Sequence, residues 1–75
     1  MIDYKGYLIV GHAVKVHPTS SGWWRSQGNV FMAAAEGSIL LKSLEGVIFE
    51  SQRAAQDHGL ELCKEWVDDK LKSKP

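Results

Sequence analysis

The last third of the chain carries the pattern that most restricts the fold. From Gln52 to about Lys72 there is no proline, and apolar or small residues recur at the 3.6-residue spacing of one helix face. That stripe consists of Ala55, Gly59, Leu62, Cys63, Trp66 and Val67. Ser51 stands directly before the helix and can cap its first turn through the hydroxyl oxygen. The sequence therefore predicts one helix over 52–72, and the preceding residues must supply the surface that covers its stripe.

The stripe also predicts how that helix packs. We expect Leu62, Cys63, Trp66 and Val67 to be buried against the covering surface. A glycine inside a helix costs about 1 kcal/mol relative to alanine. The expected compensation at Gly59 is a close approach between the helix and its neighbour.

Three segments before the helix favour strands, because they are rich in β-branched and aromatic residues. The first covers residues 7–16, the second runs from Trp23 or Trp24 to about Ala33, and the third covers 38–44. In the first segment an apolar set alternates onto one face, with His12 among its members: Leu8, Val10, Val14 and Val16.

The connections between these segments are short. Residues 17–22 read as a proline- and serine-rich loop, 34–37 as a hairpin turn with Gly37, and 46–49 as an apolar link into the helix. Sequential strands with short connections favour an antiparallel meander. We therefore predict an α+β fold, a three-stranded antiparallel meander followed by one long C-terminal helix packed on one sheet face. The whole chain, 1–75, forms a single small β-β-β-α domain, with 72–75 as a frayed tail.

Charge and cysteine content restrict the function. Nine lysines and arginines balance nine aspartates and glutamates, so the formal net charge is zero. Neutrality disfavours nucleic acid and anionic lipid as partners, and it leaves little repulsion against self-association. Cys63 is the only cysteine, so no disulfide forms within the chain. No apolar stretch resembles a signal peptide or a membrane span, so we expect a cytoplasmic protein with no membrane partner.

The residues that could carry chemistry form no motif. His12 and His17, like His58 and Cys63, lie five positions apart, a spacing that matches no established metal site. Cys63 lies on the apolar stripe, where a nucleophilic thiolate is disfavoured. No pair of carboxylates is placed for acid–base catalysis. We expect no metal site, no cofactor and no catalytic residue, and hence no enzyme.

The adjacent tryptophans are more informative. Trp23 and Trp24 must point to opposite faces if both lie in one strand. Trp24 shares its parity with Val30 and Met32 and is expected under the helix. Trp23 then belongs to the open side of the sheet, either packed on the neighbouring loop or Tyr4, or exposed as an anchor for a partner.

The candidate interaction surface on that open side consists of Trp23, Arg25, Gln27 and Phe31. Two aromatic residues among polar neighbours suit a modest interface. We therefore expect a non-enzymatic interaction module that binds a protein partner or forms a weak homodimer. Self-association would use the open sheet face or an edge strand.

Several short motifs also support a resemblance. Tyr4-Lys5-Gly6-Tyr7, Trp23-Trp24-Arg25, the 46–51 segment before Ala54-Ala55, and Trp66-Val67-Asp68 resemble those of small uncharacterised bacterial β-β-β-α proteins. This resemblance implies a fold more than a function.

The order of elements is also similar to the arm-type DNA-binding domains of integrases and to ethylene-response-factor domains. Tyr4, Lys5 and Gly6 match the start of those domains, and Phe49, Ser51 and Ala55 match their helix entry. The likeness implies a sheet that lies in the DNA major groove. The alternative function is therefore nucleic-acid binding, with contacts from Lys5, Lys15, Arg25 and Lys42.

Overall fold

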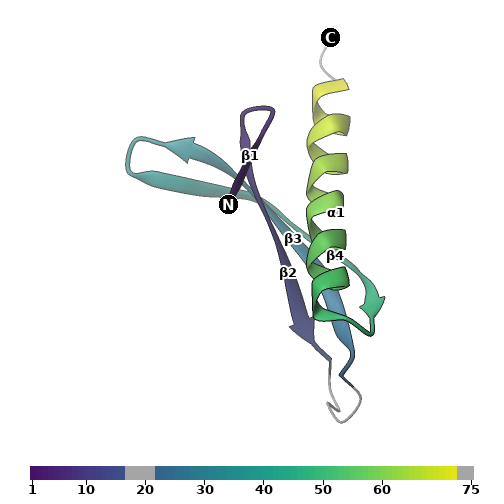
Figure 1. Cartoon of the computed structure of the whole chain (residues 1–75). Coiled ribbons are helices and arrows are strands. Elements are labelled where there is room, and N and C mark those ends of the chain that lie inside the picture. Colours follow the sequence, from purple (N-terminus) through teal and green to yellow (C-terminus); the bar gives the residue numbers. More distant parts are fainter. Residues whose placement is uncertain (17–21, 73–75) are drawn as a thin grey trace.

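A computed structural model describes residues 1–16 and 22–72 and shows an antiparallel sheet followed by one helix (Figure 1). The elements are β1 (Ile2–Tyr4), β2 (Tyr7–Lys15), β3 (Trp24–Ala34), β4 (Gly37–Phe49) and α1 (Gln52–Lys72). The strands lie in the order β1-β2-β3-β4, and every neighbouring pair is antiparallel. The α+β class is thus confirmed, whereas the predicted number of three strands is wrong. The loop proposed at 17–22 falls mostly outside the described residues, as does the 73–75 part of the proposed frayed tail.

The additional strand is β1, which pairs with the start of β2 through a two-residue turn. Lys5 and Gly6 form that turn with φ values of 52° and 90°. Positive φ at both central residues is what a type I′ hairpin turn requires. The Oδ1 atom of Asp3 accepts a hydrogen bond from the Gly6 amide at 3.3 Å. Three residues are too few for a strand pattern to show in the sequence, so only the turn could have revealed β1.

The last strand is longer than predicted, because the expected link at 46–49 belongs to β4. The pairing of β3 with β4 shifts register twice. Val30 and Phe31 pair with Lys42 and Leu40, and Arg25 and Gln27 pair with Ile48 and Glu45. Each shift leaves one extra residue on β4, first Leu41 and then one within 46–47. Such bulges bend a strand and interrupt its hydrogen-bond ladder.

The helix has the predicted bounds, and the predicted cap is confirmed. The Ala54 amide donates to the Ser51 hydroxyl oxygen at 3.2 Å. Its buried residues follow a narrow line at four-residue spacing, namely Ala55, Gly59, Cys63 and Val67. Cys63 and Val67 are therefore buried as expected. Leu62 and Trp66 are only partly buried, which corrects the prediction for both. The Trp66 ring instead meets the Tyr7 ring edge to face, with centroids 6.2 Å apart.

Glycines explain why the buried line is narrow. A Cβ atom on Gly59 would collide with the carbonyl oxygen of Gln27, and one on Gly11 would collide with that of Gln56. A Cβ atom on Gly28 would lie 2.5 Å from the carbonyl oxygen of Gly59. The backbone of α1 thus lies directly against the backbones of β2 and β3, as Gly59 led us to expect. The apolar core beside this contact is small and consists of Ile9, Val30, Cys63 and Val67.

Candidate interaction surface

The strand register assigns side chains to the two faces of the sheet, since cross-strand partners share a face. Gly11 pairs with Gly28, and Ala13 pairs with Ser26, on the side that α1 contacts. Leu8 pairs with Phe31, and Val14 pairs with Arg25, on the other side. Small residues therefore lie where the helix backbone comes closest, and Ile9 and Val30 pack beside them on the same side.

We call the side away from α1 the open face and divide it into four cross-strand rows. The Arg25 row contains Val14, Arg25 and Ile48, and the Phe31 row contains Leu8, Phe31 and Leu40. Between them lie the Gln27 row, with His12, Gln27 and Glu45, and the Asn29 row, with Val10, Asn29 and Ser43. Along the strands the open face therefore begins and ends with a row rich in large apolar side chains, with two more polar rows between.

Three apolar residues of the two outer rows are substantially exposed, whereas Leu8 and Phe31 are partly buried. The exposed fraction is 42% for Val14, 47% for Ile48 and 52% for Leu40. In the middle of the face, the side-chain oxygen of Asn29 is shielded from water and has no hydrogen-bond partner within the described residues. This shielding concerns the Asn29 oxygen alone, since His12, Ser43 and Glu45 in the same two rows are exposed.

The structure brings three of the four predicted surface residues together, because Arg25, Gln27 and Phe31 alternate along the open side of β3. Trp23 directly precedes β3 and is 39% exposed. Its carbonyl oxygen accepts a hydrogen bond from the Val16 amide at 3.1 Å. Packing of Trp23 on the loop would involve residues 17–21, which lie outside the described part of the chain.

Trp24 shares its side of the sheet with Ser26, Gly28 and Val30 and is partly buried. The Lys15 ammonium group lies 5.7 Å from its ring centroid. Met32 has the same parity but is exposed, because the end of the β3–β4 hairpin projects away from α1 (Figure 1). The expectation that the helix would cover Met32 is therefore wrong.

The sequence analysis missed the apolar contributions of β2 and β4 to the open face. Leu8 and Val14 were recognised as one alternating set, but the set was not assigned to this face. Ile48 was predicted to lie in a link and not in a strand, and Leu40 was assigned to no face. The two bulges between them change the face of Ser43 and Glu45 but not that of Leu40 and Ile48.

The cations proposed for nucleic-acid binding do not lie together. Arg25 is on the open face, Lys42 pairs with Val30 on the side that α1 contacts, and Lys15 pairs with Trp24 on that same side. Lys5 lies in the β1–β2 turn and bonds to the helix residue Asp68.

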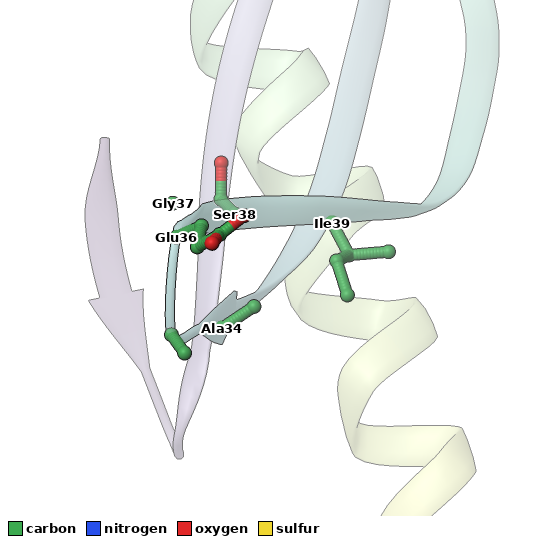
Figure 2. A pocket seen from close by; sticks show the side chains of 6 residues that line it. Ala34, Glu36, Gly37, Ser38 and Ile39 are labelled. Carbon is green, nitrogen blue, oxygen red and sulfur yellow. The ribbon is translucent and has the colours of Figure 1, made fainter.

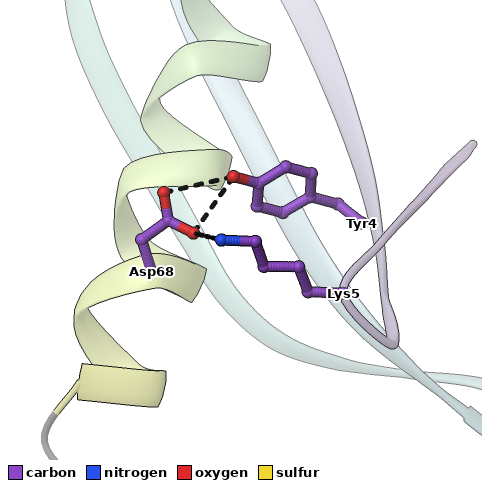
Figure 3. A network of polar contacts seen from close by, with 3 residues as sticks. All are labelled: Tyr4, Lys5 and Asp68. Carbon is purple, nitrogen blue, oxygen red and sulfur yellow. Dashed lines mark hydrogen bonds and ion pairs between the residues drawn. The ribbon is translucent and has the colours of Figure 1, made fainter.

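Figure 3 shows how Lys5 joins the turn to the helix. Its ammonium group donates to Asp68 Oδ1 at 2.8 Å, and the Tyr4 hydroxyl donates to the same carboxylate at 3.0 and 3.1 Å. The hydrogen bond from Lys5 holds the pKa of the Asp68 carboxyl below its usual range, and the same bond raises the pKa of Lys5. Tyr4, Lys5 and Asp68 thus bond to one another, and this contact links the β1–β2 hairpin to α1.

Among the described residues, Ser26 and His58 form the pair that resembles hydrolase chemistry. The Ser26 Oγ atom lies 2.7 Å from His58 Nδ1 and accepts a hydrogen bond from the Val47 amide at 3.0 Å. The Ser26 side chain is completely buried, so no substrate reaches it. The pair instead satisfies the Val47 amide at the bulge of β4, and the His58 ring packs 5.2 Å from the Phe49 ring.

Cys63 is also held in a structural environment. Its Sγ atom donates to the carbonyl oxygens of Val10 at 3.7 Å and Asn29 at 3.5 Å, and burial raises the pKa of the thiol. Within residues 1–16 and 22–72, no group of histidine, cysteine, aspartate and glutamate side chains could hold a metal ion. The candidate ligand His17 lies outside those ranges.

A hollow of about 380 Å³ lies at the β3–β4 turn (Figure 2). It is lined by six consecutive residues, 34–39, and all of them are exposed. A concavity formed by one turn and no converging polar groups lacks the features of a small-molecule site.

Comparison with known proteins assigns no family to this arrangement. No protein-family model matches the chain, and neither a curated protein nor a solved structure matches it. The only helix of the described residues, α1, is not long and apolar enough to cross a membrane.

Proposed function

We propose that this chain is a non-enzymatic protein-interaction module that self-associates through the open face. One observation carries the proposal: large apolar side chains of β2, β3 and β4 lie on the side of the sheet that the helix does not contact. A protein gains free energy when such side chains leave water, at roughly 25 cal/mol per Å² of apolar surface.

The free edges of the sheet are less suitable for pairing than its open face. The two extra residues of β4 interrupt one edge, and bulges are a common means of blocking strand addition. On the other edge, β1 covers β2 only as far as Ile9 and leaves the short stretch 10–15 without a neighbour. The open face is continuous across three strands, so it supports an interface better than either edge.

The experiment is to measure the molar mass of the purified chain by light scattering and sedimentation up to millimolar concentration. We expect a weak, concentration-dependent dimer. Phe31→Ser and Trp23→Ala should each weaken it by about tenfold, because aromatic residues are frequent interface anchors. Met32→Ser is the control, since Met32 is apolar and exposed but belongs to the other side of β3.

A wild-type chain that stays monomeric at millimolar concentration would contradict self-association. Far-UV circular dichroism must show that each variant remains folded. Nucleic-acid binding remains the alternative, and a gel shift at low salt tests it, because phosphate contacts are strongest there. Of the four cations proposed for it, only Arg25 lies on the open face.

A further inference from the structure

The open face has a pattern that matches itself in reverse. Its rows read apolar, polar, polar, apolar from the Arg25 row to the Phe31 row. Consider a two-fold axis that lies between two facing sheets, perpendicular to the strands and midway between the Gln27 and Asn29 rows. A rotation of 180° about this axis places the Arg25 row of one copy over the Phe31 row of the other. We propose that the partner is a second copy of this chain in this arrangement, so that Arg25 of each copy lies against Phe31 of the other. This inference rests on the proposed function and specifies the partner and its orientation.

Apolar contacts agree with this arrangement. Val14 of one copy faces Leu8 of the other, and Ile48 faces Leu40. Each of these residues gains an aliphatic neighbour in place of water, and each contact occurs twice. Stacked sheets lie about 10 Å apart, which is the distance that side chains of this size fill.

The charges disfavour two of the other simple arrangements. Among the four rows, Arg25 and Glu45 carry the formal charges, and neither side chain has an ion pair or hydrogen bond within the described residues. An axis parallel to the strands through β3 would stack Arg25 on Arg25. An axis through the Gln27 row would stack Glu45 on Glu45. The proposed axis avoids both repulsions and places the guanidinium of Arg25 on an aromatic ring, which is a favourable cation–π geometry.

Arg25 and Phe31 are too far apart in one chain to influence each other. Six residues of an extended strand span about 20 Å. That separation exceeds the screening length of about 8 Å at physiological salt. The effect of a substitution at position 31 on dimer affinity can therefore depend on the charge at position 25 only if residue 25 belongs to another copy.

The first test varies the sign of the charge at these two positions. Phe31→Lys and Phe31→Glu lose the same ring, but lysine would meet Arg25 of the second copy with like charge and glutamate with opposite charge. We expect the dimer of Phe31→Lys to be about tenfold weaker than that of Phe31→Glu, because the contact occurs twice. In an Arg25→Glu background the order should reverse. An order that is the same in both backgrounds would overturn the inference.

The second test keeps the ring and uses cross-linking, in case both charged variants remain monomeric. Leu40→Cys and Ile48→Cys should cross-link with a short bismaleimide when they are mixed. Neither variant should cross-link alone, since the proposed axis separates identical positions by about 20 Å. The wild type serves as the control, because Cys63 is buried.

The outcomes separate this inference from the proposed function. The arrangement would be overturned if either variant alone cross-linked, or if the mixture did not cross-link while the wild type dimerised. Either result would leave self-association standing. A monomeric wild type would overturn both.

Discussion

The two faces of the sheet differ in the size of the side chains that they present. At the close contact with α1 the strands carry Gly11, Ala13, Ser26 and Gly28, with only Ile9 and Val30 as large core residues beside them, whereas the open face carries residues such as Leu8, Phe31 and Ile48. In most small domains the larger apolar residues lie under the covering helix. Here the helix comes so close that its backbone occupies the space that those side chains would need.

This difference shows that the buried face of a sheet need not carry all of its large apolar side chains. The covered face gains stability from close backbone contact and a few well-packed residues. The open face keeps apolar surface that the chain itself does not cover. The predictions below test whether the two faces behave as differently as their side chains imply.

The largest effect is expected from a side chain inserted between helix and sheet. Gly59→Val should lower the free energy of unfolding by about 3 kcal/mol or more, because the atoms in its way belong to the backbone of Gln27. Urea denaturation followed by tryptophan fluorescence measures this change. Glu65→Val places the same side chain on an exposed helix position and should cost less than about 1 kcal/mol. Equal losses would show that the close contact is not maintained.

Thiol reactivity gives a second comparison. Cys63 lies under the helix with its pKa raised by burial, so a maleimide reagent should modify it at least about a hundredfold more slowly in native than in denaturing buffer. A cysteine placed on the open face by Val14→Cys should react at nearly the denatured rate. Rapid native labelling of Cys63 would mean that the helix opens readily.

A smaller effect is expected from Ser26→Ala, which removes the acceptor of the Val47 amide and the partner of His58. Leaving these groups unsatisfied should cost about 2 kcal/mol. Ser43→Ala makes the same change at an exposed position of the open face and should cost almost nothing. A neutral Ser26→Ala would indicate that the contact at the bulge does not stabilise the fold.

The smallest effect concerns Asp68, whose carboxylate bonds to Tyr4 and Lys5 at the surface. Its pKa is lower in the folded chain than in the unfolded chain, so its contribution is present above the unfolded pKa and is lost as the pH falls through the folded pKa. Thermal melts below about pH 4 should therefore show a slightly steeper loss for the wild type than for Asp68→Asn. Asp69→Asn, at the adjacent exposed position, should retain the wild-type dependence.

The sequence was sufficient for the elements that have a long repeating signal. The spacing of Ala55, Gly59 and Cys63 predicted the helix, and Ser51 predicted where it begins. The hairpin turn at Gly37 was also predicted, and the observed φ of 134° confirms a backbone conformation there that favours glycine. Each of these features depends on local backbone preference, which a sequence displays directly.

Features that depend on contacts between elements were not predictable in the same way. The alternation of Leu8 and Val14 identified a face of β2 but not which face the helix would contact. Gly11 and Gly28 gave a signal for close approach only in combination with Gly59. Gly59 was considered alone, and Gly11 within the first predicted strand was interpreted as a bulge or a bend. The bulges of β4 were missed because an extra residue leaves no mark on composition. The placement of Ser43 and Glu45 on the open face was missed with them.

The two bulges of β4 also interrupt the exposed edge of the sheet. A regular exposed strand accepts a neighbour, and each added copy offers the next one a fresh edge, which is how fibrils grow. With its ladder interrupted at Leu41 and again within 46–47, β4 offers only short stretches for such growth. Face-to-face docking, by contrast, would cover the open faces of both copies at once, with Ile39, Leu41 and Val47 left outside the interface. In the proposed arrangement, assembly therefore stops at a closed pair instead of polymerising.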